Sequence, residues 1–363
     1  MSFEDLDVRF QKLVRRFGGR AKPRQLVQFT RQLATLVGAG LPLVRSLNTL
    51  TEQVDAGPLK EAVCTIRDEV ESGTSFSEAL SQYPRIFGNL YVSMIRAGEI
   101  GGQLDLILKR LADLLEKSDR LRRRVKSAMM YPIFVLAVAF LILLLLMVYV
   151  VPTFIKMFSE LGGALPTPTR ILILMSEMIR HRWWVLVVVF ALLFVFWAWA
   201  AKLPAVRFWI DKTKLKLPGI GRFVRQVAVA RFARTLGTLL ASGVPILKGL
   251  DVASQTVGNR QMEVALEEVA RSIKEGESIA GPLEASGVFE PIVVRMVSVG
   301  EETGKLDEML ARVADSFEEE VDVSVSGITS ILEPLLIVSM AVIVGFIVIA
   351  MFLPMFTLAK LIQ

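Results

Sequence analysis

A chain of 363 residues of which 53% are hydrophobic is too apolar for an ordinary soluble protein. Its 42 basic and 36 acidic residues give a formal net charge of +6, so the placement of charge along the chain matters more than the total. Cys64 is the single cysteine, which excludes an intrachain disulfide and a cysteine-based zinc site. His181 is the single histidine, which excludes a two-histidine metal site. We therefore expect no metal.

Residues 23–131, after a short N-terminal extension at 1–22, are predicted to form a cytoplasmic helical domain. Phe29, Leu33 and Leu36 recur at helical spacing, and no sustained alternation of apolar and polar residues indicates a sheet. We expect about six short helices in a compact bundle, the last of them long and extending over about 103–126. The residues expected at its turns are Gly40, Pro42, Gly98 and Gly102.

Three stretches are apolar enough to cross a bilayer, which takes about 20 residues of helix. They are predicted as transmembrane helices at 132–154, 183–201 and 334–356. Between and after them we expect a periplasmic loop at 155–182, a second cytoplasmic helical domain at 202–333 and a periplasmic tail at 357–363. Basic residues gather before the first span and after the second, so the positive-inside rule places the N-terminus in the cytoplasm. The cluster before the first span, expected to set topology or contact anionic lipid, is Arg120, Arg122, Arg123, Arg124 and Lys126.

The chain contains an internal duplication, which defines the expected architecture. Residues 29–47 match residues 232–250 at eight of 19 positions with an offset of 203. After a slip of one residue, Gly98-Glu99-x-x-Gly102-x-Leu104-Asp105 matches Gly300-Glu301-x-x-Gly304-x-Leu306-Asp307. The repeated unit is a helical domain followed by one span, and the span at 183–201 lies outside it. That extra crossing returns the chain to the cytoplasm, so both domains share one compartment. The turn residues of the second domain are Gly243, Pro245, Gly300 and Gly304. The predicted fold is all-α, with two homologous bundles and three transmembrane helices.

Several acidic residues lie in or beside these turns or before the third span, where core packing does not require them. Those at the start of the long helices can favour the helix dipole; the alternative is contact with a partner or a second copy. Because the segment before the first span is basic and that before the third is acidic, we predict that the two domains bind different faces or partners. The candidate contact residues are Glu99, Asp105, Glu301, Asp307, Glu318, Glu319 and Glu320.

No motif for catalysis was found. The string from Gly300 to Leu306 is one residue too short for a phosphate-binding loop and lacks its hydroxyl residue. No acid pair is marked out as a catalytic couple. The span centres carry no charge, unlike those of a typical transporter. A channel or transporter, recognised by solute passage through the reconstituted protein alone, and a membrane-bound enzyme, recognised by turnover, are the alternative classes. The basic cluster beside a span favours lipid over nucleic acid.

The duplicated F-x-R-x-L-x-T-L-x-x-x-G-x-P and G-E-x-x-G-x-L-D segments, with spans at these positions, resemble the inner-membrane platform family of type II secretion (protein F) and type IV pilus assembly (PilC). The resemblance covers about residues 22–356. It implies a non-enzymatic, multi-pass protein of the bacterial inner membrane. It also implies as partners a hexameric cytoplasmic ATPase, pilin or pseudopilin subunits, other inner-membrane assembly proteins and further copies of the chain. The sequence leaves open whether the machine secretes proteins, extends or retracts a pilus, or takes up DNA.

Overall fold

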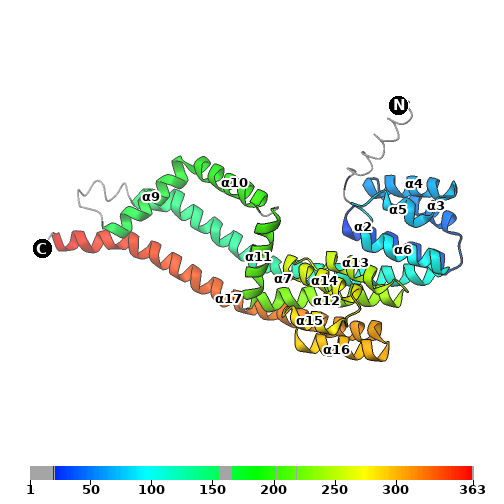
Figure 1. Ribbon diagram of the computed structural model, residues 1–363. Coiled ribbons are helices and arrows are strands. Elements are labelled where there is room, and N and C mark those ends of the chain that lie inside the picture. The colour runs from blue at the N-terminus through cyan, green and yellow to red at the C-terminus, as the bar shows by residue number, and fades with distance from the viewer. Residues whose placement is uncertain (1–18, 20, 155–165, 201–202, 218, 362–363) are drawn as a thin grey trace, which may run out of the picture. The chain divides into compact units, whose positions relative to one another are not determined.

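A computed structural model describes residue 19 and residues 21–154, 166–200, 203–217 and 219–361, and within these ranges every regular element is a helix (Figure 1). The predicted all-α fold class is confirmed. The predicted N-terminal extension is almost wholly outside the described residues, and so are residues 155–165 of the expected periplasmic loop. By its internal contacts the chain divides into two units. Unit 1 comprises Met1–Arg124 and Asp211–Asp322, and unit 2 comprises Val125–Ile210 and Val323–Gln363.

The first repeat in unit 1 forms a bundle whose helix starts follow from local sequence. Pro23 and Pro58 occupy first helical turns, where the missing amide N–H costs nothing. The Ser75 side chain accepts a hydrogen bond from the backbone N–H of Glu78 at 3.3 Å, as expected for a helix cap. The helices are α2 (Pro23–Gly38), α3 (Leu43–Gln53), α4 (Pro58–Glu71), α5 (Phe76–Ser81), α6 (Asn89–Gly101) and the start of α7 (Leu104–Leu145).

The second repeat has the same order of helices, preceded by α11 (Pro204–Lys216). Gly40 and Gly243 have φ values of 85° and 78°, so both predicted turns use a left-handed backbone that favours glycine. The helices of this repeat are α12 (Ile220–Ala241), α13 (Ile246–Thr256), α14 (Arg260–Lys274), α15 (Ala280–Ala285), α16 (Pro291–Thr303) and the start of α17 (Leu306–Leu361).

Each repeat has its own apolar core, and the equivalent positions are buried in both. Phe29 packs with Phe87 at a ring-centroid distance of 6.3 Å, and Phe232 packs with Phe289 at 5.5 Å. The core of the first repeat also contains three side chains from α12, α13 and the loop between them. The two bundles of unit 1 are therefore joined by apolar contact, through Leu239, Val244 and Val252.

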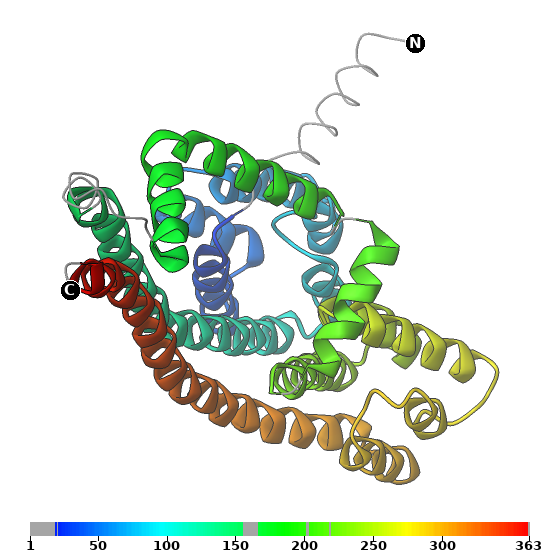
Figure 2. The ribbon, with the colours of Figure 1, turned by 90° about the vertical axis from the view of Figure 1, so that its left-hand side faces the viewer.

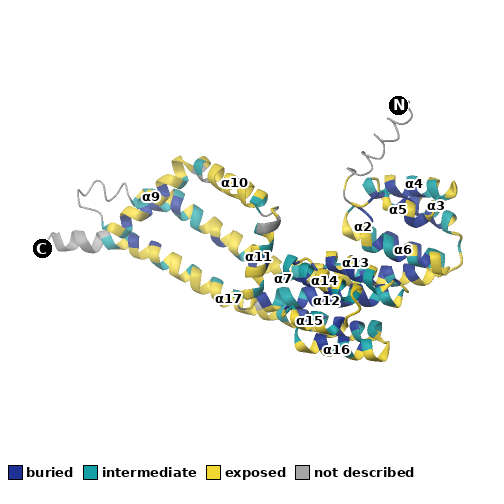
Figure 3. Cartoon of the chain, in the orientation of Figure 1, coloured by how far each residue is buried: buried dark blue, intermediate teal, exposed yellow. Residues whose placement is uncertain are grey.

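Unit 2 is built from apolar helices. The helix α7 continues beyond Arg124 through the π-helical segment η1 (Leu146–Val150) to Phe154, and α17 is one uninterrupted helix, shown along its length in Figure 2. Leu104–Phe154 and Leu306–Leu353 each contain a stretch long and apolar enough to cross a membrane, and only 11% and 17% of those stretches is buried. Figure 3 shows this exposure along both helices. The predicted domain limits at 131/132 and 333/334 lie within α7 and α17, not at breaks between helices.

The second expected span, residues 183–201, differs from the other two. It forms helix α10 (Trp183–Ala200), but its described apolar stretch, Val187–Ala200, is shorter than 18 residues. Two helices of spanning length are therefore found among the described residues, and not the three that were predicted. The expected loop 155–182 also contains a helix, α9 (Thr167–His181), which begins after Pro166 and carries a proline in its first turn. In the sequence, the spacing of Thr169, Leu172 and Ser176, which are the buried residues of α9, could have indicated this helix.

Candidate functional site

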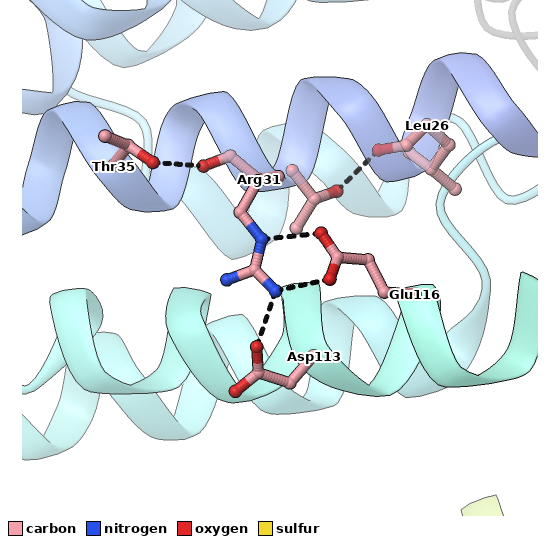
Figure 4. A network of polar contacts seen from close by, with 6 residues as sticks. Leu26, Arg31, Thr35, Asp113 and Glu116 are labelled. Carbon is pink, nitrogen blue, oxygen red and sulfur yellow. Dashed lines mark hydrogen bonds and ion pairs between the residues drawn. The ribbon is translucent and has the colours of Figure 1, made fainter. Parts of the chain in front are cut away.

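An arginine network connects the first helix of repeat 1 to the long helix α7 (Figure 4). The Arg31 guanidinium donates from Nε and Nη2 to the two carboxylate oxygens of Glu116, at 2.6 and 2.8 Å, and from Nη2 to Asp113 at 2.5 Å. This two-pronged geometry is the strong form of an arginine–carboxylate contact. The hydrogen bond from Arg31 lowers the pKa of Glu116 below its ordinary value. The network attaches α2 to α7 just before α7 leaves unit 1.

Repeat 2 contains the same network at the equivalent positions. Arg234 Nε donates to Glu318 at 2.8 Å, and Arg234 Nη2 pairs with Asp315. Partial burial opposes ionisation of Asp315, but the hydrogen bond from Arg234 and the nearby positive charges leave its pKa below the ordinary value. Lys117 of repeat 1 also contacts Asp315, at 3.3 Å. Sequence analysis missed these networks, although Asp113-x-x-Glu116 and Asp315-x-x-Glu318 repeat at the offset of 202.

The basic and acidic segments, from whose charge we predicted different binding faces or partners for the two domains, contact each other within the chain. Lys117 pairs with Asp315, and Arg124 pairs with Asp322, so oppositely charged stretches of α7 and α17 face one another. Beside them lies a groove of about 870 Å³ between the repeats. Its charged lining includes Arg120, Arg122, Arg124, Arg231, Glu318 and Glu319. The opposite charges of the two segments therefore form ion pairs with each other within the chain.

The remaining predicted residues before the spans are distributed around the two helices. Arg123 is within 3.3 Å of Asp119 one turn earlier on α7, and the exposed Lys126 lies in unit 2. Glu320 accepts a hydrogen bond from the Gln226 side chain at 2.6 Å. Glu319 is exposed, and none of the described residues bonds to its carboxylate.

The repeated G-E-x-x-G-x-L-D segments have a local structural role. The Glu99 carboxylate accepts hydrogen bonds from the backbone N–H groups of Phe76 and Ser77, at 2.5 and 3.0 Å. Glu301 accepts from Ile279 with both oxygens at 3.0 Å. Each glutamate thus satisfies free N–H groups at or beside the start of a six-residue helix, α5 or α15. Their carboxylates are engaged within their own repeats.

The two aspartates and four glycines of these segments complete the junction before each long helix. Asp105 and Asp307 stand in the first turns of α7 and α17, Asp105 exposed and Asp307 half-buried. Gly102 and Gly304 end α6 and α16 in the left-handed conformation, as predicted for turns. The prediction was wrong for Gly98 and Gly300, which lie inside helices. The close approach of the long helix explains them, since a Cβ on Gly300 would be 2.9 Å from Leu306 Cα.

Two buried hydroxyl groups of α9 join the apolar helices of unit 2. Ser176 Oγ donates to the Met147 carbonyl in η1, and Thr169 Oγ1 donates to the Ala350 carbonyl of α17, both at 2.6 Å. A π-helical turn loosens the regular backbone bonding, so a hydroxyl can satisfy a carbonyl that the helix leaves free. Around these bonds Leu172 packs with apolar side chains of both long helices. Helix α9 therefore links the ends of the two candidate spans.

No cluster of metal-ligating side chains occurs in the part of the chain that the structure describes. The structure instead defines a duplicated helical scaffold whose two bundles each continue into a candidate membrane helix. Two segments, 29–152 and 232–354, match the family described as "Type II secretion system (T2SS), protein F". The chain belongs to this family, and the two matches confirm the internal duplication.

Curated relatives cover nearly the whole chain. It is 43% identical over 347 residues to the type IV pilus assembly protein PilC of Myxococcus xanthus, covering 96% of this chain and 83% of the relative. It is 44% identical over 334 residues to PilC of Thermus thermophilus, covering 92% and 82%. It is 38% identical over 344 residues to the type II secretion system protein F of Aeromonas hydrophila, covering 94% and 88%. The names of these relatives support a role in secretion or pilus assembly.

Proposed function

We propose that this chain is a non-enzymatic platform in the bacterial inner membrane that couples a cytoplasmic assembly ATPase to the insertion of pilin-like subunits into a fibre. One observation carries the proposal. Each of the two bundles continues, without a break in the helix, into an apolar segment of spanning length, through α7 and α17. A movement imposed on a bundle is therefore transmitted to the bilayer along one continuous helical rod, which in α7 lacks a backbone hydrogen bond at Pro132. The names of the relatives supply the setting of a pilus or secretion machine.

The arginine networks make this transmission efficient. Arg31 fixes α2 to α7, and Arg234 fixes α12 to α17, in each case before the helix enters its apolar segment. A force on the first helix of either bundle therefore reaches the long helix through these ion pairs as well as through the apolar core. The pairing of Arg124 with Asp322 connects the two rods to each other. A displacement of one bundle would accordingly be shared by both membrane helices.

The topology belongs to the same proposal. Both bundles lie in the cytoplasm, with the N-terminus, so the chain must cross back between them. We assign this crossing to the uncharged 18-residue helix α10, although its described apolar stretch is shorter than those of α7 and α17. The exposed Arg122 and Lys126 lie near the headgroups of the cytoplasmic leaflet, where each basic residue contributes about 1 kcal/mol of attraction to anionic lipid. Labelling of single cysteines placed at Glu61 and Glu284 in a Cys64→Ser background tests this. Both sites should react only after the inner membrane is permeabilised, and reaction of either one in intact spheroplasts contradicts the topology.

The central test interrupts the rod. Insertion of Gly-Gly-Ser after Arg124 breaks α7 between its bundle and its apolar segment. The same insertion after Asp55, in the loop between α3 and α4, is the matched control. In a host that lacks its own copy, the first insertion should abolish surface fibres or secretion at a normal protein level, and the control should retain them. Normal fibre output from the interrupted rod would overturn the coupling mechanism.

Among the acidic candidates, Glu319 is the residue best suited to test for contact with a partner. Reversal of Glu318 or Glu320 would also remove their bonds to Arg234 and Gln226, so any loss of fibres would be ambiguous. Glu319→Lys should reduce co-purification of the ATPase without lowering the melting temperature. Glu268→Lys, at an exposed glutamate of α14, is the control. Unchanged co-purification of the ATPase would remove Glu319 from the proposed contact.

A further inference from the structure

Apart from the pairing of α7 with α17, the two repeats of unit 1 contact each other through surfaces that are not equivalent. Helix α6 of repeat 1 packs against α13 of repeat 2, and the Asn89 side chain donates to Gln255 at 2.8 Å. Arg110 of α7 donates to the carbonyl of Ala241, the last residue of α12. On the repeat 2 side, Leu239 and Val244 are 0% and 5% exposed because they join the core of repeat 1.

Each of these two surfaces has an equivalent in the other repeat. The contacts of Asn89 and Arg110 mark the docking face of repeat 1, and we assign to it the half-buried Leu90, Ser93 and Ala97, which follow Asn89 along α6. The alignment of the repeats gives the equivalent face in repeat 2. The receiving face of repeat 2 includes Leu239, Ala241, Val244 and Gln255, and it likewise has an equivalent in repeat 1. The second docking face is Ile292, Arg295, Val299 and Arg312, and the second receiving face is Leu36, Gly38, Leu41 and Glu52.

The second docking face is open. Ile292 and Val299 lie two turns apart on α16 and are 54% and 48% exposed. Arg295 lies between them and is exposed. Arg312 on α17 occupies the position at which Arg110 finds a carbonyl, yet none of the described residues accepts a hydrogen bond from it. An apolar stripe with two unpaired arginines is therefore exposed in repeat 2.

The second receiving face is open as well, and its charge is complementary. Leu36 and Leu41 are partly exposed, where their counterparts Leu239 and Val244 are buried by the other repeat. The carbonyl of Gly38, at the end of α2, accepts no hydrogen bond from the described residues. Glu52 is exposed and has no ion-pair partner among them. It corresponds to Gln255, which receives the hydrogen bond from Asn89.

We propose that the docking face of repeat 2 binds the receiving face of repeat 1 in a second copy of the chain. The contact reproduces between molecules the one that joins the repeats within a molecule, so it continues an existing interface. Arg312 would donate to the Gly38 carbonyl, and Arg295 would lie within one turn of the position opposite Glu52. Because two different surfaces meet, the contact is head-to-tail, and it builds a closed ring or an open array. The inference rests on the proposed function, because it specifies how copies of the platform contact one another. The contact itself can be measured without fibre assembly.

Cysteine cross-linking in membranes tests the contact. In a Cys64→Ser background, one full-length chain carries Leu41→Cys and another, with a different tag, carries Val299→Cys. Oxidation of membranes containing both should give a disulfide-linked species of two different tags, and neither variant should link to itself. Glu61→Cys on α4 replaces Leu41→Cys in the control and should not link to Val299→Cys. Absence of the mixed species, self-linking of Val299→Cys to the same extent, or equal linking by the control would each overturn the proposal.

A charge exchange supplies a second readout. Arg295→Glu in the Val299→Cys chain should lower the yield of the mixed species several-fold, and Glu52→Arg in the Leu41→Cys chain should restore it. Both substitutions are at exposed positions, and the melting temperature of each variant shows that it is folded. If the two substitutions together lower the yield as much as Arg295→Glu alone, the faces do not meet as proposed. If the mixed species forms as expected but the insertion after Arg124 leaves fibre output normal, the proposed function fails and the contact between copies stands.

Discussion

Replacing Arg234 with methionine should destabilise the protein more than the same replacement at Arg31. The two arginines pair with equivalent carboxylates, but the Arg234 side chain is 15% exposed and the Arg31 side chain 35% exposed. Water screens the more exposed network, so Arg31→Met should cost about 0.5–1 kcal/mol. Arg234→Met leaves Glu318 without its partner and Asp315 with Lys117 alone, and because the Arg234 side chain is mostly buried this should cost about 2 kcal/mol.

The difference of about 1 kcal/mol corresponds to about 2–4 °C in melting temperature for a domain of this size. Thermal unfolding of the full-length protein in detergent micelles, followed by far-ultraviolet circular dichroism, measures it. Arg45→Met, at an exposed arginine of α3 whose side chain has no partner among the described residues, controls for loss of a surface charge. If Arg31→Met lowers the melting temperature as much as Arg234→Met, burial does not set the strength of these networks.

Three further results are expected from the same unfolding measurement. Glu116 and Asp315 have lowered pKa values in the folded state, so the stability that they contribute is present above about pH 4 and is lost as pH falls below it. Glu116→Gln should therefore flatten the acid limb of the curve of melting temperature against pH, and an unchanged limb would contradict the assignment. Glu301→Ala should cost about 0.5–2 kcal/mol because amide groups beside α15 lose their acceptor, and a neutral effect would show that water replaces it fully. Ser176→Ala should cost about 0.6–1.7 kcal/mol through loss of the bond to the Met147 carbonyl, whereas Ser339→Ala, at an exposed serine of α17, should cost less.

Much of this architecture could be derived from local sequence, because the forces involved act over short distances along the chain. Helical periodicity identified the stripe that includes Phe29 and Leu33, and both are buried. A long charge-free run avoids the cost of placing charge in lipid, so the apolar segments of α7 and α17 were recognisable from composition. The duplication was visible because both copies must satisfy the same packing at the same junctions, and the family match confirmed it.

The failures of prediction involve contacts between distant parts of the chain. Arg31 and Glu116 are 85 residues apart, and no local pattern indicates that they meet. Lys117 and Asp315 are 198 residues apart, and their pairing could not be predicted because sequence does not show that folding sets α7 against α17. Gly300 resembles a turn residue in the sequence, but it lies inside α16, where the absence of a side chain lets the long helix approach closely. Periodicity and hydropathy thus define the helices and the candidate spans, whereas folding brings their side chains together and so selects the pairs that hold the scaffold.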